Sequence, residues 1–284
     1  MENITTQTII GIFVLAGIIM GLLVPIVAIV TGNYGTPLGR YEWFHKFISW
    51  FNMTKKLVET KEINVTDSVI LDISTSSGAV RIVTSNTSQI IVKIYEIERV
   101  LPLFFRTTGT EEYRIVTTNN TVSISVEGYY LEVLVPDNIT WSLVVNVAGG
   151  AVELDINAGR LTGVTATISG GVIDFKAVDI GVSNITLDID GGVCNLDLKY
   201  REFTGSSKLS ITVSGGVLDS TIKLSTRTKI AITGSITGGV ETITVDNNKI
   251  SLPYTEQGYN EASSKLNIAL DISGGVADIE INRW

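Results

Sequence analysis

The sequence predicts an all-β domain of the β-solenoid type, similar to a β-helix, with an N-terminal transmembrane α-helix. Three observations predict this fold class: an uncharged N-terminal segment, an alternation of apolar and polar residues after about residue 62, and a glycine pair that recurs within that alternation. A chain of 284 residues with 44% hydrophobic and 18% charged residues can also bury a substantial core.

The N-terminal segment from Ile9 to Val30 carries no charged residue. At about 1.5 Å per residue, a helix of this length spans about 33 Å, which is enough to cross the hydrocarbon core of a bilayer. We therefore expect residues 1–8 to be a short cytoplasmic tail and residues 9–31 to be a transmembrane helix in contact with the lipid bilayer. A cleaved signal peptide is the alternative, but no Lys or Arg precedes the apolar stretch.

Two features of the sequence predict opposite orientations for this helix. Arg40, Lys46 and Lys55 follow it, and the positive-inside rule would place them in the cytoplasm. Against this, the chain is rich in N-x-S/T triplets, which accept N-linked glycans only outside the cytoplasm. We favour a single-pass protein of the cell membrane with an extracellular main domain. Beyond the N-terminal Asn3, its glycosylation candidates are Asn52, Asn64, Asn86, Asn119, Asn138 and Asn184.

Residues 32–62 form a predicted interfacial helix or linker that is rich in aromatic residues. Trp and Tyr just beyond a membrane span are typical of the membrane–water interface. The aromatic residues assigned to this interface are Tyr41, Trp43, Phe44, Phe47, Trp50 and Phe51. A helix that packs on a neighbouring membrane subunit and a core helix beneath the external domain remain open alternatives. His45, the single histidine, is read as an interfacial side chain rather than a metal ligand.

Residues 63–284 repeat a short motif around a glycine pair, as in ATISGGVIDFKA and TLDIDGGVCNLDL. Successive pairs lie 21, 21, 24, 23 and 36 residues apart, a period that suits one coil of a solenoid. We interpret the paired glycines as corners. They are Gly149 and Gly150, Gly170 and Gly171, Gly191 and Gly192, Gly215 and Gly216, Gly238 and Gly239, and Gly274 and Gly275.

The apolar residues change parity at each glycine pair. Leu187 and Ile189 precede one pair on odd numbers, whereas Leu196 and Leu198 follow it on even numbers. A continuous strand would bury one parity throughout, so the switch predicts a bend that glycine accommodates. The segment LDISTSSGAVRI, residues 71–82, is a seventh copy. A β-sandwich or barrel built from the same hairpins is the main alternative.

Two stretches interrupt the regular repeat. Residues 88–136 contain longer predicted strands, which form either a hairpin or wider coils of the same stack. A second widening lies at Asp246 to Ser263. Loops that enlarge a repeat usually gather on one face, where binding sites are common.

At these repeats the chain resembles the family of bacterial and archaeal cell-surface proteins known as putative adhesins. Their β-helical domain repeats an I-x-(S/T)-G-G-V pattern, and it often follows an N-terminal membrane helix. The resemblance covers about residues 66–282. It implies a β-helical fold and an adhesin-like surface role, and it supplies no catalytic residues. The 36-residue gap and the aromatic segment depart from the family pattern.

The composition excludes most catalytic and binding chemistries. A net charge of −8 without a run of Lys or Arg argues against a nucleic-acid partner. A single cysteine and a single histidine exclude disulfide frameworks, thiolate zinc clusters and Cys–His couples, so we expect no cofactor and no metal. Cys194 itself is interpreted as a small buried hydrophobic residue.

Acidic residues recur within the coils. Asp188 and Asp190 precede a glycine pair but lack the further ligands of a calcium loop. A ladder of carboxylates on one face would suit a cation or a glycan, although a solvated face is the simpler reading. The recurring residues are Asp155, Asp174, Asp197 and Asp278.

Together these observations predict a membrane-anchored, extracellular surface protein with a non-catalytic structural, adhesin-like or assembly role. Its expected partners are the lipid bilayer, and either membrane-protein subunits or cell-surface glycans. An accessory subunit of an integral membrane complex is the alternative function. A polysaccharide-active enzyme is less favoured, because carboxylates and basic residues do not converge in the sequence and aromatic residues that could stack on sugars are few.

Overall fold

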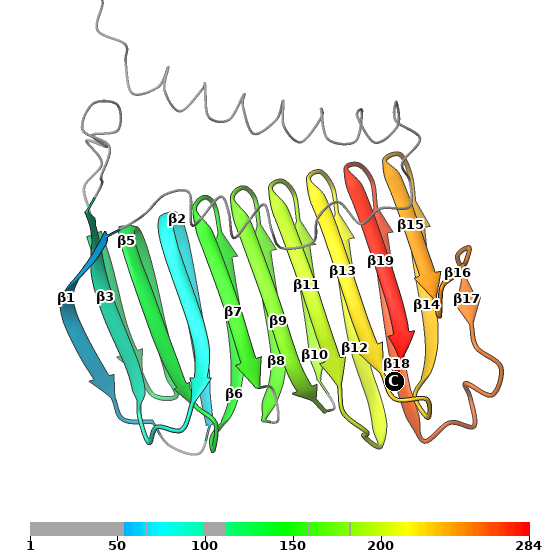
Figure 1. Cartoon of the computed structure of the whole chain (residues 1–284), viewed down its shortest axis with the longest axis horizontal. Helices are drawn as coiled ribbons and strands as arrows, with labels where there is room; N and C mark the ends of the chain where they lie inside the picture. The colour runs from blue at the N-terminus through cyan, green and yellow to red at the C-terminus, as the bar shows by residue number, and fades with distance from the viewer. Residues whose placement is uncertain (1–53, 66–67, 99–111, 158–159, 182) are drawn as a thin grey trace, which may run out of the picture. The chain divides into compact units, whose positions relative to one another are not determined.

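The computed structural model describes residues 54–65, 68–98, 112–157, 160–181 and 183–284 (Figure 1). The predicted tail, membrane span and aromatic segment at 1–53, which include Asn52, lie outside the described residues. Within the described part, no helix has the length and apolar character needed to span a membrane. The described chain is all-β.

The regular elements are strands that follow one another closely along the chain. They are β1 (Thr54–Ile63), β2 (Ser68–Ser85), β3 (Ile90–Glu98), β4 (Glu112–Thr118), β5 (Thr121–Pro136), β6 (Thr140–Val147), β7 (Ala151–Asn157), β8 (Leu161–Ile168), β9 (Val172–Ile180), β10 (Asn184–Ile189), β11 (Val193–Tyr200), β12 (Gly205–Val213), β13 (Val217–Leu224), β14 (Lys229–Ile236), β15 (Val240–Val245), β16 (Asn248–Lys249), β17 (Tyr254–Thr255), β18 (Ser264–Ile272) and β19 (Val276–Arg283). The sheet therefore begins at Thr54, earlier than the expected residue 63.

All these strands belong to one large sheet, most of which is arranged as two parallel ladders. In ladder A, β8 pairs with β6 and β10, and β10 pairs with β12. In ladder B, β9 pairs with β7 and β11, and β11 pairs with β13. The chain alternates between the ladders, so each turn adds one strand to both. The long strands β2 and β5 belong to both ladders, because their two halves pair with each other in parallel.

The order of the layers differs from the order of the sequence at both ends of the stack. The last turn, β18 and β19, lies between β12/β13 and β14/β15. Correspondingly, β2 lies between β5 and β6/β7. The wide spacing between the last two glycine pairs therefore does not mark one enlarged coil, because Val217 is the neighbour of Val276 and Val276 is the neighbour of Val240.

Antiparallel strands cover the outermost layers. At one end, β3 and β4 pair with the two halves of β5, and β1 pairs with β3. At the other end, β16 pairs with β15 and β17 pairs with β14. Residues 88–136 thus contain both predicted alternatives, a further coil in β5 and antiparallel strands beside it. Capping of this kind shields backbone groups that would otherwise form an exposed sheet edge.

The core lies between the two ladders and consists of straight rows of aliphatic side chains. Every second residue of β13 is buried, and neighbouring strands repeat the pattern in register. One such row in ladder A contains Leu187, Ala166 and Ile211, all almost fully buried. Burying one large aliphatic side chain contributes about 1.5 to 3 kcal/mol, and a single turn buries only a few. The layers are therefore stable only as a stack.

The paired glycines occupy the bends where the chain passes from ladder A to ladder B. The second glycine of each pair has a positive φ, for example +80° at Gly192. A Cβ atom at Gly192 would lie 2.3 Å from the carbonyl oxygen of Gly171 in the next layer. The bends stack so closely that a side chain has no room. Gly78, outside the predicted pairs, occupies the same position next to Gly150.

The change in burial parity falls at the glycine pair itself, one residue earlier than the apolar pattern predicts. Ile189 before the bend and Cys194 after it are fully buried, whereas Val193 between them is partly exposed. The residue that follows each pair, alanine in the first pair and valine in the other five, lies on the outer surface, because the bend reverses which residues face inward.

Candidate interaction surfaces

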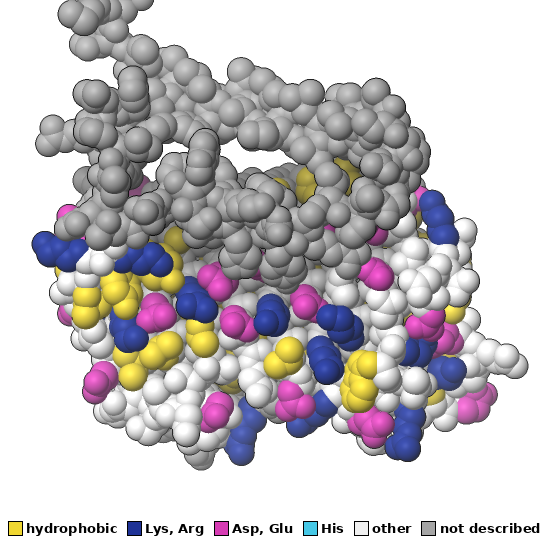
Figure 2. All heavy atoms as spheres, viewed as in Figure 1, with side chains coloured by type: hydrophobic (Ala, Val, Ile, Leu, Met, Phe, Trp, Pro, Cys, Tyr) yellow, Lys and Arg dark blue, Asp and Glu magenta, His cyan; other side chains and the backbone are white. Residues whose placement is uncertain are grey.

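The outer side of ladder B, which we call the charged face, carries straight rows of charged side chains. Residues at the same register lie about 4.8 Å apart across neighbouring strands. The first row contains Glu153, Asp174, Asn195, Asp219 and Asp278. The second row contains Asp155, Lys176, Asp197, Thr221 and Glu280. Figure 2 shows basic and acidic side chains interspersed over this face.

The four recurring aspartates of the sequence therefore lie on one face, but in two rows. Asp174 and Asp278 belong to the first row, and Asp155 and Asp197 belong to the second, where Lys176 separates them. The rows follow from the distance to the second glycine of each pair, three residues for the first row and five for the second. Counting the residues between that glycine and each aspartate would have assigned the aspartates to their two rows from the sequence.

Basic residues lie between the carboxylates of the charged face. Arg81 Nε is 3.3 Å from Glu153, Lys223 Nζ is 3.4 Å from Asp197, and Lys93 Nζ is 2.9 Å from Glu132. The hydrogen bond with Glu132 raises the pKa of Lys93 above its usual value. Each exposed ion pair of this kind contributes about 0 to 1 kcal/mol to the free energy of unfolding. These pairs therefore determine the charge pattern of the surface more than the stability of the fold.

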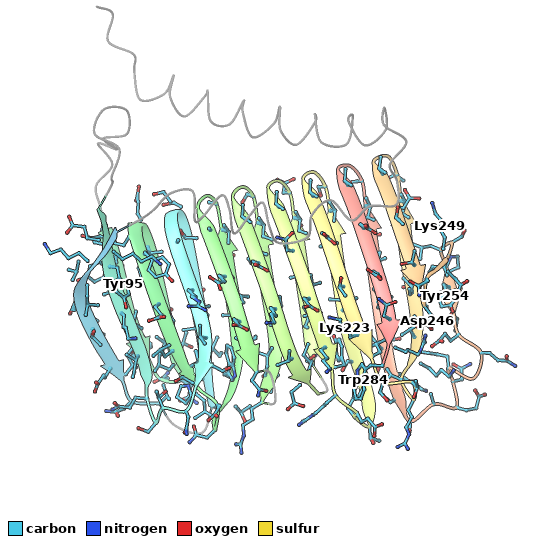
Figure 3. The ribbon with its side chains drawn as sticks, in the orientation of Figure 1. Tyr95, Lys223, Asp246, Lys249, Tyr254 and Trp284 are labelled. Atoms are coloured by element: carbon cyan, nitrogen blue, oxygen red, sulfur yellow. The ribbon has the colours of Figure 1, made fainter. Side chains whose placement is uncertain are left out.

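A third row places Lys199 beside Lys223, and Trp284 lies close to it. The Lys199 ammonium lies 5.3 Å from the centre of the Trp284 ring, which remains 54% exposed. The Trp284 amide donates a hydrogen bond to the Leu224 carbonyl oxygen at 3.0 Å. Figure 3 shows Lys223 and Trp284 near the same end of ladder B. This corner combines positive charge with an exposed aromatic ring, and sequence analysis did not identify it.

The outer side of ladder A, which we call the hydroxyl face, differs sharply from the charged face. One row across it contains Asp72, Val144, Thr165, Thr186, Ser210, Ala269 and Thr233. Most of these side chains are small and uncharged. Asp188 lies in the adjacent row and Asp190 lies in a bend. Among the described residues, no group of three or more His, Cys, Asp or Glu side chains could hold a metal ion.

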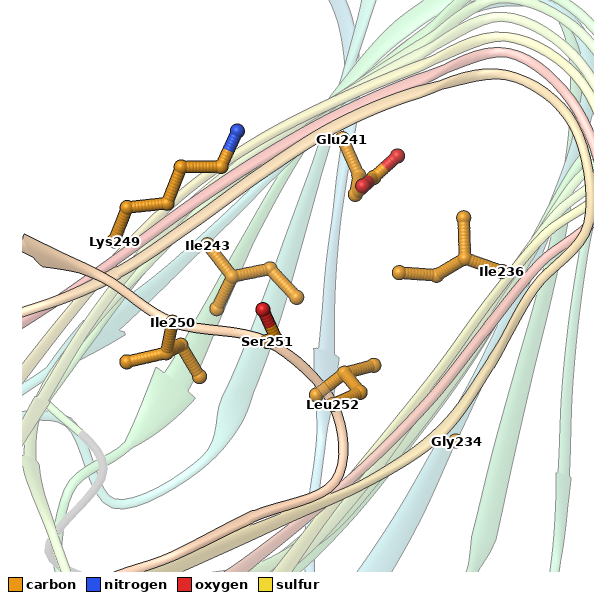
Figure 4. A pocket seen from close by; sticks show the side chains of 8 residues that line it. All are labelled: Gly234, Ile236, Glu241, Ile243, Lys249, Ile250, Ser251 and Leu252. Atoms are coloured by element: carbon orange, nitrogen blue, oxygen red, sulfur yellow. The ribbon is translucent and has the colours of Figure 1, made fainter.

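A hollow of about 300 Å³ lies beside the outermost layer, next to β14 and β15 (Figure 4). Its apolar lining comes from Ile236, Ile243, Ile250 and Leu252, while Glu241 and Lys249 add charge. Glu241 occupies the register where the preceding layer has the buried Ala277, but it belongs to the last layer and is partly exposed. The cap formed by residues 246–263 thus leaves part of the stack end open.

The cap is held against β19 by a cluster of ionic contacts. Arg283 contacts both Asp246 and Glu256 through its guanidinium group. Glu256 also accepts a hydrogen bond from the backbone amide of Ile230 at 2.9 Å. Figure 3 shows Asp246, Lys249 and Tyr254 together at this end of the molecule. Arg283 therefore ties the cap to the layer that lies beneath β14 and β15.

The remaining predictions concern Cys194, the acceptor asparagines and the aromatic interface residues. Cys194 is fully buried, and burial, with a smaller effect from the Asp174 charge, raises the pKa of its thiol. The predicted acceptor asparagines within the described part are all exposed: Asn64, Asn86, Asn119, Asn138 and Asn184. The predicted interface residues Tyr41, Trp43, Phe44, Phe47, Trp50 and Phe51 lie outside the described residues.

Comparison with known proteins gives two similar solved structures. A "putative cell adhesion protein" from Clostridium sporogenes aligns with a TM-score of 0.46 and 14% identity, over 81% of this chain and 100% of its own. A "putative adhesin" from Bacteroides fragilis aligns with a TM-score of 0.30 and 12% identity, over 80% and 98%. No protein-family model matches the sequence, and no curated protein matches it either.

Proposed function

We propose that this chain is a membrane-anchored β-solenoid protein that lies outside the cell and acts without catalysis. In this role the stacked domain is a rigid surface component, adhesin-like or used in assembly, held to the bilayer by residues 9–31. The two parallel ladders support the solenoid assignment, because each turn of the chain adds one rung to both. The anchor and the external location rest on the sequence arguments.

The charged face is the observation that carries this proposal. Its acidic and basic side chains keep one register over β7, β9, β11, β13 and β19. Rows of this kind place a polar or charged group about every 4.8 Å, so the face can make many weak contacts with an extended, repetitive partner at once. Many weak contacts along one line suit adhesion or assembly.

Two measurements test this function. Impermeant labelling of intact cells should reach the domain, and labelling only after lysis would contradict the external location. Binding of cells or envelope fragments to the immobilised protein should fall at least tenfold in the variant Lys199→Glu/Lys223→Glu, which alters the charged face. The matched control, Lys208→Glu/Lys229→Glu, makes the same charge change on strands β12 and β14 of ladder A and should bind normally. Equal binding by both variants would contradict a role for the charged face.

Extraction in mild detergent separates this proposal from the alternative of an accessory subunit. A surface module migrates as its own species on native gels. Constant co-migration with other membrane proteins would instead support the subunit.

A further inference from the structure

The two long edges of the stack differ in chemistry. One edge, the bend edge, contains the stacked glycine pairs. Of the exposed residues that immediately precede these pairs, only Asp190 is charged. They are Ala148, Ser169, Asp190, Ser214, Thr237 and Ser273. The opposite edge, the loop edge, contains the connections from ladder B back to ladder A and includes charged residues such as Arg201, Glu202 and Arg227.

All the acceptor asparagines in the described part lie on the loop edge. Asn86 follows β2, whose second half runs away from the bend, and the neighbouring Asp137 amide donates to the Ser85 carbonyl oxygen at 3.1 Å. Asn138 comes next in that connection. Asn184 is the first residue of β10, which runs from the loop edge to the bend at Asp190.

The other two acceptors reach this edge through the antiparallel strands. Asn119 lies in the turn between β4 and β5, where Thr118 pairs with Thr121 at the beginning of β5. Asn64 follows β1, and its side-chain oxygen accepts a hydrogen bond from Gln89 at 2.5 Å, directly before β3. These acceptors come from separate turns of the chain, so their shared location is a property of the fold rather than of local sequence.

We propose that the loop edge is N-glycosylated at Asn64, Asn86, Asn119, Asn138 and Asn184. This inference rests on the external location proposed above. In the reaction, each Asn side-chain nitrogen bonds to the anomeric carbon of a lipid-linked oligosaccharide. The bond from that carbon to the phosphate of the lipid carrier breaks, the carrier leaves with the electron pair, and the amide nitrogen loses one proton. Glycans so placed cover one edge and leave both faces accessible.

The test maps the modified sites on the full chain purified from its native membranes. Enzymatic release of glycans in heavy-oxygen water converts each modified Asn into labelled Asp, which peptide mass spectrometry detects. We expect label at the five loop-edge asparagines. Impermeant labelling of intact cells runs in parallel. A domain that is external but unlabelled at these sites would overturn the glycan proposal while leaving the proposed function intact, and a domain that is not external would overturn both.

Discussion

The stacked bends make a quantitative prediction for the variant Gly192→Ala. Gly192 has φ +80°, and an added Cβ would lie 2.3 Å from the Gly171 oxygen and 3.1 Å from the Gly171 nitrogen. A left-handed conformation costs a non-glycine residue about 1 to 2 kcal/mol. Relief of the contact separates two layers and weakens the bond from the Val193 amide to the Gly171 oxygen, worth about 0.5 to 1.5 kcal/mol. We expect a loss of about 1.5 to 3.5 kcal/mol in the free energy of unfolding.

The matched control is Gly258→Ala in the cap. Gly258 has φ +76°, but no atom lies within 4 Å of an added Cβ. The Gly258→Ala variant therefore loses only the free energy needed to hold alanine in the left-handed conformation. Both variants are stabilised equally by the reduced flexibility of the unfolded chain. Urea unfolding of the full chain in micelles, followed by circular dichroism, measures both. Equal losses in the two variants would refute the argument that the glycines are required by stacking.

Three further predictions concern the end layer and the buried groups. Deleting residues 264–284 removes the ladder partners of β14 and β15, so hydrogen exchange should accelerate throughout residues 229–245 and stay slow in β10 and β11; continued protection of 229–245 would contradict the layer order. Burial raises the pKa of Tyr200 above its usual value, so its share of stability is complete below about pH 10 and is lost as the pH rises further. The melting temperature of the wild type should therefore fall above that pH more steeply than that of Tyr200→Phe, and parallel curves would count against this. Cys194 should resist thiol reagents in the native protein and react after unfolding, because its side chain is fully buried; rapid native labelling would disprove that burial.

The sequence predicted the local features of the domain well, because they are written in neighbouring residues. The glycine pairs locate the bends, and the alternation of apolar residues around them identifies the inward side chains. The coil formed by β5 was left undecided between a hairpin and a wider coil, since a lone Gly128 stands where other turns have a pair. Its parity still switches, from Val126 before the glycine to Leu131 after it, and this was the available signal.

The order of layers could not be predicted, because it depends on pairing between residues far apart in sequence. The row of Val217, Val276 and Val240 contains one residue type, so nothing local distinguishes the true neighbour from the next repeat. The charged face was predicted in part, because Asp174 and Asp197 were grouped although they belong to different rows. The end hollow was missed because it depends on the path of the cap over the last layer.

The displaced turns at the two ends of the stack restrict how this domain can change in length. Since β2 and β18/β19 are each enclosed by an outer layer, neither end offers a free rung onto which another copy could be added. A duplicated or deleted turn fits only among the sequential layers between β6 and β13, where each copy meets its own predecessor and successor. The enclosed turns therefore fix both ends of the stack, and the domain can evolve to a greater or smaller length only by gaining or losing turns between them.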